Sequence, residues 1–370
     1  MTRGVHGVSL GPQSFVFQHI HLFLLGALFG FFRINRLLGL FIFFEKSAVL
    51  IFIMVLAWGY QPERVLASLR LLIYTAARAI PLLIRFLLLK HLWGISQVVD
   101  LLSLRSQKNI KGLLGVRLTL GFIVKFPVYG LHLWLPQAHV EASAGGSILL
   151  AGVLLKMGGY GLYLVRPLLP ALQGYRLAAW CVATSARVRL LCLRQRDIKL
   201  LIAYSSIAHM RLVVATLTTK TNLGLSASIF IMLAHGVRAS LRFFLTGELY
   251  NWSRRRQLYI NQSLLSSIPL LRMVWFLSAV ANIGTPPTAN FWGELLALFV
   301  LVPKRRGYVF FLSVGLFLGA AYTILLYGAI HRGQSPIGQL HRPTFPLKTF
   351  ICRGVHVVFR LLLILLFSLV

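Results

Sequence analysis

The amino-acid sequence predicts an all-α polytopic membrane protein. Three observations support this fold class: 58% of the 370 residues are hydrophobic, only 12% are charged, and the mean hydropathy is +0.79. In soluble domains roughly a quarter of the residues are charged, and they cover much of the surface. A chain with so few charges requires lipid as the solvent for much of its surface.

Apolar segments follow one another along almost the whole chain, each near the length of about 20 residues that a membrane-spanning helix needs. Backbone groups inside a bilayer must satisfy their own hydrogen bonds, so we expect these segments to be helical and to make about 11–12 spans. We predict an N-terminal span at 1–36, a helical bundle at 37–330, and a loop with a C-terminal transmembrane helix at 331–370. The candidate spans are 14–32, 37–58, 66–89, 112–135, 144–165, 175–193, 198–219, 223–247, 264–285, 288–302, 308–330 and 349–370.

The charge balance is strongly basic, with 38 lysines and arginines against 7 acidic residues and a formal net charge of +31. In a soluble protein this balance would indicate a nucleic-acid partner. Here many arginines lie within apolar segments and no RNA-binding signature accompanies them, so we expect no nucleic acid. Anionic lipids such as cardiolipin, and acidic residues of neighbouring subunits, are the expected partners of the loop arginines.

The cysteines give no indication of a metal or redox site. Cys181, Cys192 and Cys352 lie in apolar surroundings without metal-ligand spacing, and no iron–sulfur or haem pattern is present. We therefore expect no cofactor on this chain.

Prolines interrupt two apolar segments. Pro127 and Pro136 follow Lys125, and Pro286-Pro287 interrupt a later segment. Proline removes a backbone donor and breaks a helix, which lipid tolerates only where protein or a wet cavity satisfies the freed groups. Broken helices beside a charge form the ion sites of transporters, whereas a simple packing kink is the alternative.

The acidic residues differ in their surroundings. Glu45 lies within the apolar run 37–58, and Glu294 follows the Pro-Pro break. A carboxylate at the bilayer centre costs about 2.5–3.5 kcal/mol, so both positions indicate a function with a partner or a water path. Asp197 stands at a predicted helix start, where a carboxylate complements the helix dipole. Glu63, Asp100 and Glu248 lie at or near span ends, where we expect a solvated or capping role. We assign no role to Glu141.

Lys125 and Lys156 also lie within apolar segments, and their charge is opposite to that of Glu45 and Glu294. Burial disfavours the charged form of lysine and a nearby carboxylate favours it, so a lysine with a variable carboxylate neighbour can act as a proton switch. His209 and His235 also lie within spans, and histidine can take and pass a proton near neutrality. A single histidine in a membrane is more often hydrogen-bonded packing, but two of them beside buried lysines and glutamates favour a relay. The predicted proton path consists of Glu45, Lys125, Lys156, His209, His235 and Glu294.

Specific motifs then point to a family. The stretch HLWLPQAHVEA at 132–142 is the strongest, and it lies in an ordered series that spans roughly residues 40–330. The series resembles the chain 4 family of NADH-ubiquinone oxidoreductase, the antiporter-like membrane subunits of mitochondrial complex I. The matching segments are 58–64, 125–142, 155–161, 196–210, 232–236 and 286–295.

The resemblance implies a location in the mitochondrial inner membrane beside other membrane-arm subunits, especially antiporter-like ones. It implies that Glu45 and Lys125 form a charge pair, that Lys156 is the central lysine, and that His209 and His235 lead to Glu294. Ubiquinone reduction elsewhere in the complex would perturb the pair and change the proton affinity of Lys156. The resemblance also implies that FMN, iron–sulfur clusters and ubiquinone are bound by other subunits, with no redox chemistry on this chain.

Two features depart from the family pattern. Before Glu45 there is room for only about one span, where the family has about four, so the chain is expected to be N-terminally shortened. Arginines also lie inside predicted spans, and those at 211 and 238 are expected to oppose proton passage through the nearby histidines. One explanation is that these arginines contact lipid phosphates or acidic residues of other subunits. The alternative is that codon reassignment or transcript editing places other residues at these positions in the expressed chain. The in-span arginines are Arg78, Arg85, Arg117, Arg187, Arg189, Arg211, Arg238 and Arg242.

Two alternative functions remain open at this point. One is a structural membrane-arm subunit that no longer pumps, and the other is a subunit of a related cation/proton antiporter. The buried acidic and basic residues favour a pumping subunit, whereas the in-span arginines favour a structural one.

Overall fold

A computed structural model describes residues 12–332, except 104–107, 124, 129, 263–268 and 287. Its regular elements are helices, which confirms the predicted fold class. They are α1 (Pro12–Arg33), α2 (Leu37–Trp58), α3 (Arg64–Trp93), α4 (Asp100–Ser103), α5 (Lys108–Ile123), α6 (Trp134–Glu141), α7 (Ala144–Leu149), η2 (Leu150–Leu154), α8 (Leu155–Val165), η3 (Arg166–Leu168), α9 (Ala171–Leu193), α10 (Ile198–Thr218), α11 (Asn222–Ser253), α12 (Pro269–Ile283), α13 (Ala289–Leu301), η4 (Val302–Lys304) and α14 (Gly307–His331).

Within the described residues, 7 helical segments are long and apolar enough to cross a membrane. Several other predicted spans are shorter as helices because a break interrupts them, as in α5 and α13. Helix α9 is long enough, but it carries Arg176, Arg187 and Arg189. The predicted span 349–370 lies outside the described residues.

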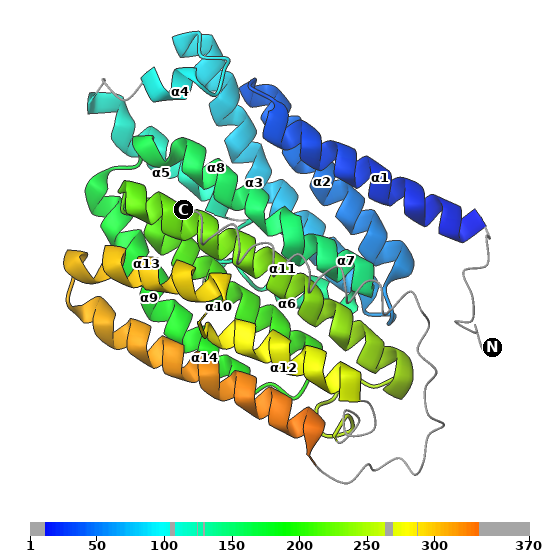
Figure 1. The fold of residues 1–370 in the computed structure, drawn as a ribbon. Coiled ribbons are helices and arrows are strands. Elements are labelled where there is room, and N and C mark those ends of the chain that lie inside the picture. Colours follow the sequence, from blue (N-terminus) through cyan, green and yellow to red (C-terminus); the bar gives the residue numbers. More distant parts are fainter. Residues whose placement is uncertain are drawn as a thin grey trace.

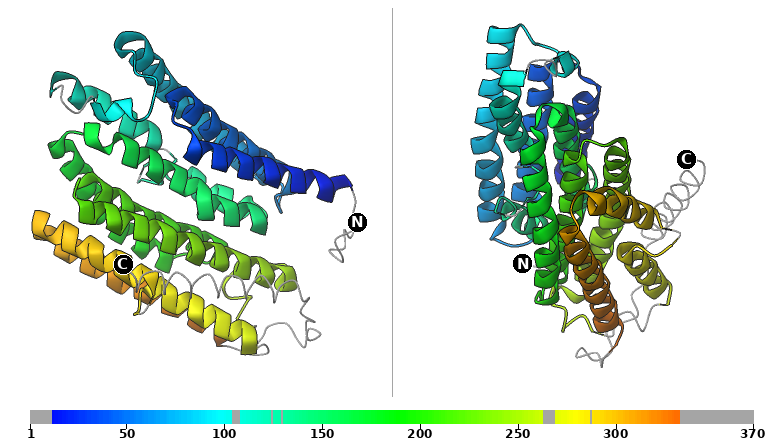
Figure 2. Two further views of the ribbon diagram at one scale, coloured as in Figure 1. Left: turned by 45° about the horizontal axis from the view of Figure 1, so that its top comes forward. Right: turned by 90° about the vertical axis from the view of Figure 1, so that its left-hand side faces the viewer.

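The helices run side by side, with the N-terminal helices at one edge and the C-terminal helices at the other, and α9 packs on both α10 and α14 (Figures 1 and 2). Helices α1–α3 form one edge and α12–α14 the opposite edge. Helix α10 lies between them and packs on α6, α8, α9, α11 and α13. In its apolar window 89% of the residues are buried, against 29% in α3, so α10 is the central helix of the bundle.

Two helices are broken, as predicted from the prolines. The first break separates α5 from α6 and contains Lys125 and Pro127. The second separates α12 from α13. Gly130 and Gly284 have φ angles of 91° and 77° in these breaks, a left-handed conformation that glycine adopts at little cost.

Asp197 begins α10 as the sequence predicted. Its carboxylate accepts hydrogen bonds from the backbone N–H groups of Lys199 (2.8 Å) and Leu200 (3.2 Å). This cap satisfies donors that would otherwise be unpaired at the helix start.

Candidate functional site

Glu45 and Lys125 form an ion pair between α2 and the first break. Lys125 Nζ lies 3.3 Å from Glu45 Oε1, and the two side chains are 2% and 22% exposed respectively. The same ammonium donates a hydrogen bond to the carbonyl of Phe44 and lies 3.4 Å from the centre of its ring. A buried charge is stable only with such partners, so the break is built around this lysine.

Lys156 occupies the first turn of α8, directly after a π-helical segment. This segment, η2 (Leu150–Leu154), widens the helix, and the carbonyl of Ala151 accepts a hydrogen bond from Lys156 Nζ. Single π-helical turns inside α-helices frequently occur at functional sites. The same ammonium lies 3.1 Å from His235 Nδ1 on α11.

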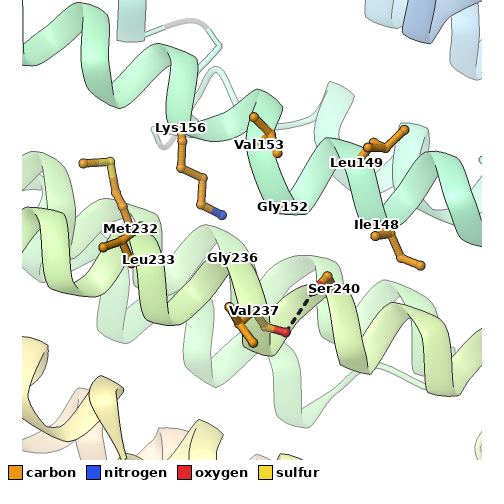
Figure 3. A pocket seen from close by; sticks show the side chains of 10 residues that line it. All are labelled: Ile148, Leu149, Gly152, Val153, Lys156, Met232, Leu233, Gly236, Val237 and Ser240. Atoms are coloured by element: carbon orange, nitrogen blue, oxygen red, sulfur yellow. Dashed lines mark hydrogen bonds between the residues drawn. The ribbon is translucent and has the colours of Figure 1, made fainter. Parts of the chain in front are cut away.

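The Lys156 side chain points into a cavity of about 350 Å³ between η2 and α11 (Figure 3). Gly152 and Gly236 lie on its facing walls. A Cβ at Gly236 would lie 3.2 Å from the carbonyl oxygen of Gly152 and 3.5 Å from Lys156 Nζ. Glycine at 236 therefore allows α11 to approach the lysine closely.

His235, His209 and Glu294 continue from Lys156 in a connected series. The ring centres of His235 and His209 are 6.3 Å apart, and His209 Nδ1 lies 3.1 Å from Glu294 Oε1. All three side chains are buried. They belong to α11, α10 and α13, so the series crosses the interior of the bundle.

The six predicted residues thus form two groups. The described residues show no direct contact between Lys125 and Lys156. Ser47 lies between the groups, donating to the carbonyl of Phe44 at 2.8 Å and approaching Met157 Sδ at 3.4 Å. A transfer from one group to the other would need a bridge or a movement at this point.

The glycine of the second break makes room for Glu294. A Cβ at Gly284 would lie 2.9 Å from Glu294 Oε2, closer than side-chain carbons approach. Its positive φ adds a second requirement for glycine. The break therefore positions the carboxylate as well as ending α12.

Arg189 is a site residue that the sequence reasoning did not assign. Its Nη2 atom lies 3.6 Å from Glu294 Oε1, and the side chain is buried. Cβ atoms at Gly315 and Gly319 of α14 would lie 2.7 and 3.7 Å from the Arg189 guanidinium. These two glycines, four residues apart, were the available signal, because such spacing lets helices approach closely.

The other suspected arginines take different positions. Arg211 donates to the carbonyl of Thr184 at 2.7 Å and lies 3.4 Å from that of Pro127. The arginines within electrostatic range of His209 are Arg238, Arg189 and Arg242. Arg238 therefore lies near His209, whereas Arg211 is directed towards backbone carbonyls.

A second polar cluster at the loop end of the bundle was also not predicted. Arg256 Nη1 lies 3.1 Å from Glu141 Oε1, and its Nε lies 3.7 Å from Asp197. Lys199 Nζ donates to the carbonyls of Val140 (3.2 Å) and Ala142 (2.5 Å). The cluster ties the end of α6 to the start of α10 and to the loop after α11.

Tyr60, in the loop between α2 and α3, covers this cluster. The Lys199 ammonium lies 5.3 Å from the centre of the Tyr60 ring. The backbone N–H of Tyr60 donates a hydrogen bond to the Glu141 carbonyl at 3.3 Å. Burial raises the pKa of the Tyr60 phenol above its usual value, so the ring remains neutral in this position.

Within the parts of the chain that the structure describes, no three metal-ligating side chains of the His, Cys, Asp or Glu type gather around one point. The site is therefore described by its ionisable groups alone.

Comparison with known proteins identifies the family. Residues 35–319 match the family described as "NADH:quinone oxidoreductase/Mrp antiporter, TM". NADH-ubiquinone oxidoreductase chain 4 of Lumbricus terrestris is 33% identical over 98% of this chain and 81% of its own length. The Aedes aegypti chain 4 is 38% identical over 85% of this chain and 71% of its own length. The chain belongs to the NADH-ubiquinone oxidoreductase chain 4 family.

As a member of the chain 4 family, it is an antiporter-like, multi-pass subunit of respiratory complex I in the mitochondrial inner membrane. Solved structures confirm the chain 4 fold. A chain of respiratory complex I from Thermus thermophilus has a TM-score of 0.87 at 23% identity, covering 94% of this chain and 75% of that one. A chain of the archaeal membrane-bound sulfane sulfur reductase has a TM-score of 0.84 at 23% identity, covering 93% and 59%.

Proposed function

We propose that this chain translocates protons for complex I, coupling electron transfer from NADH to ubiquinone with proton movement through its buried acidic and basic groups. The observation that carries the proposal is the connected series from Lys156 through His235 and His209 to Glu294. Adjacent members lie within 3.1 Å at both ends of the series, with the two histidine rings 6.3 Å apart. Ionisable groups are expensive inside a membrane and mark proton relays.

The Glu45–Lys125 pair is the proposed input to this series. When the pair is intact, the Glu45 carboxylate offsets the Lys125 charge. Opening the pair would leave a positive charge near Lys156 and favour release of its proton, because like charges disfavour each other's charged forms. The proton would then pass through His235 and His209 to Glu294. Moving a charge against the membrane potential costs about 2.3 kcal/mol per 100 mV.

The energy for this step would come from other subunits. In this proposal FMN, the iron–sulfur clusters and ubiquinone are bound elsewhere in the complex, and this chain supplies no redox chemistry. Its direct partners would be neighbouring antiporter-like subunits of the membrane arm.

A Lys156→Ala variant of the intact complex, reconstituted into liposomes, tests the proposal. We expect a lower ratio of protons translocated to NADH oxidised. Lys46→Ala is the matched control, because Lys46 is an exposed lysine on α2. An unchanged ratio in an assembled Lys156→Ala complex would support the alternative of a structural subunit that does not pump. Sodium-dependent translocation by the wild-type complex would support the alternative of a cation/proton antiporter subunit.

Anionic lipid such as cardiolipin is a further proposed partner. A cavity of about 510 Å³ between α9 and the start of α14 is lined by Arg176, Lys304 and Arg305 together with Tyr175, Trp180 and Tyr308. Basic pockets between membrane helices bind phospholipid headgroups, and aromatic residues favour the membrane interface. Replacing Lys304 by Gln should lower the amount of cardiolipin that copurifies, measured by mass spectrometry of extracted lipids.

A further inference from the structure

His139 is a buried ionisable residue that the proposed path does not use. It lies on α6, is 0% exposed, and its ring stacks on Phe243 with centres 4.3 Å apart and an angle of 6° between the ring planes. Neither of its ring nitrogens has a hydrogen-bond partner among the described residues. Buried polar atoms are almost always bonded to protein or to ordered water, so this imidazole marks a place for water in the interior.

A polar cavity reaches the same short helix from the loop end of the bundle. It has a volume of about 340 Å³ and lies between α3, α6 and the start of α10. Three of the seven acidic residues of the chain line it: Glu63, Glu141 and Asp197. Glu141 is 4% exposed, and its Oε2 atom has no hydrogen-bond partner within the described part of the chain, while Oε1 is paired with Arg256. Glu141 thus lines the cavity with one buried carboxylate oxygen that has unused capacity to accept a hydrogen bond.

Lys199, on α10, lies against the end of α6, the helix that carries both Glu141 and His139. Its ammonium binds the carbonyls of Val140 and Ala142, on either side of Glu141, and so fixes the end of the helix. It lies within electrostatic range of both Glu141 and His139. On the inner side, His139 lies within electrostatic range of Lys156 and His235.

We propose that Glu141 and His139 form an access branch that carries protons between the loop-end cavity and the central Lys156–His235 pair. Glu141 takes a proton from water in the cavity at Oε2 and releases it to water at the end of α6. Neutral His139 accepts that proton on one ring nitrogen and releases the proton of the other nitrogen towards neutral Lys156, which becomes charged. His139 returns to its neutral form, so the number of protons is conserved at each step. Lys199 acts as a positioning residue for the end of α6.

This inference rests on the proposed function, and the experiment separates the two. His139→Phe keeps an aromatic ring stacked on Phe243 but cannot carry a proton. In the reconstituted complex we expect it to lower the ratio of protons translocated to NADH oxidised to the level of Lys156→Ala. His132→Phe is the matched control, because His132 is a buried histidine of the same broken segment outside the branch, and it should keep the wild-type ratio.

The outcomes are distinct. A wild-type ratio in His139→Phe beside a lowered ratio in Lys156→Ala overturns the branch and leaves the proposed function intact. A wild-type ratio in Lys156→Ala overturns the proposed function itself. If His139→Phe does not assemble, Glu141→Gln decides: its amide oxygen can still accept from Arg256, and a wild-type ratio in this variant also overturns the branch.

Discussion

His209 Nδ1 lies 3.1 Å from Glu294 Oε1, which joins the central helix α10 to the helix that follows the second break. This contact is the last link of the Lys156 series, and both side chains are buried. A proton that reaches His209 has a carboxylate acceptor at hydrogen-bonding distance.

Replacing His209 by Gln should interrupt this link. The glutamine amide can donate a hydrogen bond to a carboxylate but cannot take up a proton at neutral pH. We expect a lower ratio of protons translocated to NADH oxidised in reconstituted complex, with normal assembly. His331→Gln, at the end of α14, provides the control and should leave the ratio unchanged. Equal ratios in both variants would argue against a role for His209 in transfer.

The Glu45–Lys125 pair predicts a non-additive effect on stability. Glu45→Gln leaves the buried lysine without its carboxylate, and breaking a buried pair costs about 3–5 kcal/mol. Adding Lys125→Met removes the uncompensated charge and should restore much of the lost stability. Thermal unfolding of the subunit within the isolated complex measures both variants. Additive losses would show that the two residues do not stabilise each other.

Gly284→Ala should be costly because the position combines a φ of 77° with a Cβ site 2.9 Å from Glu294 Oε2. Backbone strain of this kind costs of order 1–3 kcal/mol, and the carboxylate must move as well. We expect reduced proton translocation together with reduced thermal stability. Gly307→Ala is the control, since a Cβ there meets no atom within 4 Å. Similar behaviour of the two variants would contradict the steric argument.

The interior arginines predict a difference between the written and the expressed chain. Arg238 and Arg242 are 3% and 2% exposed and lie within electrostatic range of His209, where added positive charge is expensive. Arg256, at the loop end of the bundle, is ion-paired with Glu141 and Asp197. We expect peptides from a tryptic digest of the purified subunit to end at Arg256 but to run uncut through positions 238 and 242, as codon reassignment or transcript editing would produce.

Cleavage at 238 and 242 would show instead that arginine is present at both positions. Glu294, which lies within electrostatic range of Arg238, would then offset part of this charge, together with lipid or acidic residues of neighbouring subunits. Mass-spectrometric sequencing of the same peptides identifies the residue at each position directly.

Composition and proline placement were sufficient to predict the helical class and both breaks. Lipid forces the backbone of each segment into helices. Pro127 and Pro286 interrupt helices however the rest of the chain packs, because the effect of proline is local. The N-terminal cap at Asp197 was equally local, because a carboxylate there needs only the first turn of its own helix.

The contacts between helices could not be predicted from local rules. Lys156 and His235 are 79 residues apart in the sequence, and only the packing of α8 on α11 brings their side chains to 3.1 Å. Ionisable residues within apolar segments supplied these candidates and the resemblance to a family matched them, but neither gave their division into two groups at Ser47. Arg189 was missed because the only local signal was the spacing of Gly315 and Gly319 on another helix, and His139 was missed because its importance depends on the cavity beside α6.

The enclosure of α10 has a consequence for how the bilayer acts on this protein. Other helices surround α10, so acyl chains do not touch the helix that carries His209. Changes in acyl-chain saturation or bilayer thickness therefore act first on the outer helices, such as α3 and α14, whose side chains remain largely exposed. Because α10 is shielded from lipid, membrane composition should affect the lifetime of the assembled subunit more than the rate of the proposed proton transfer.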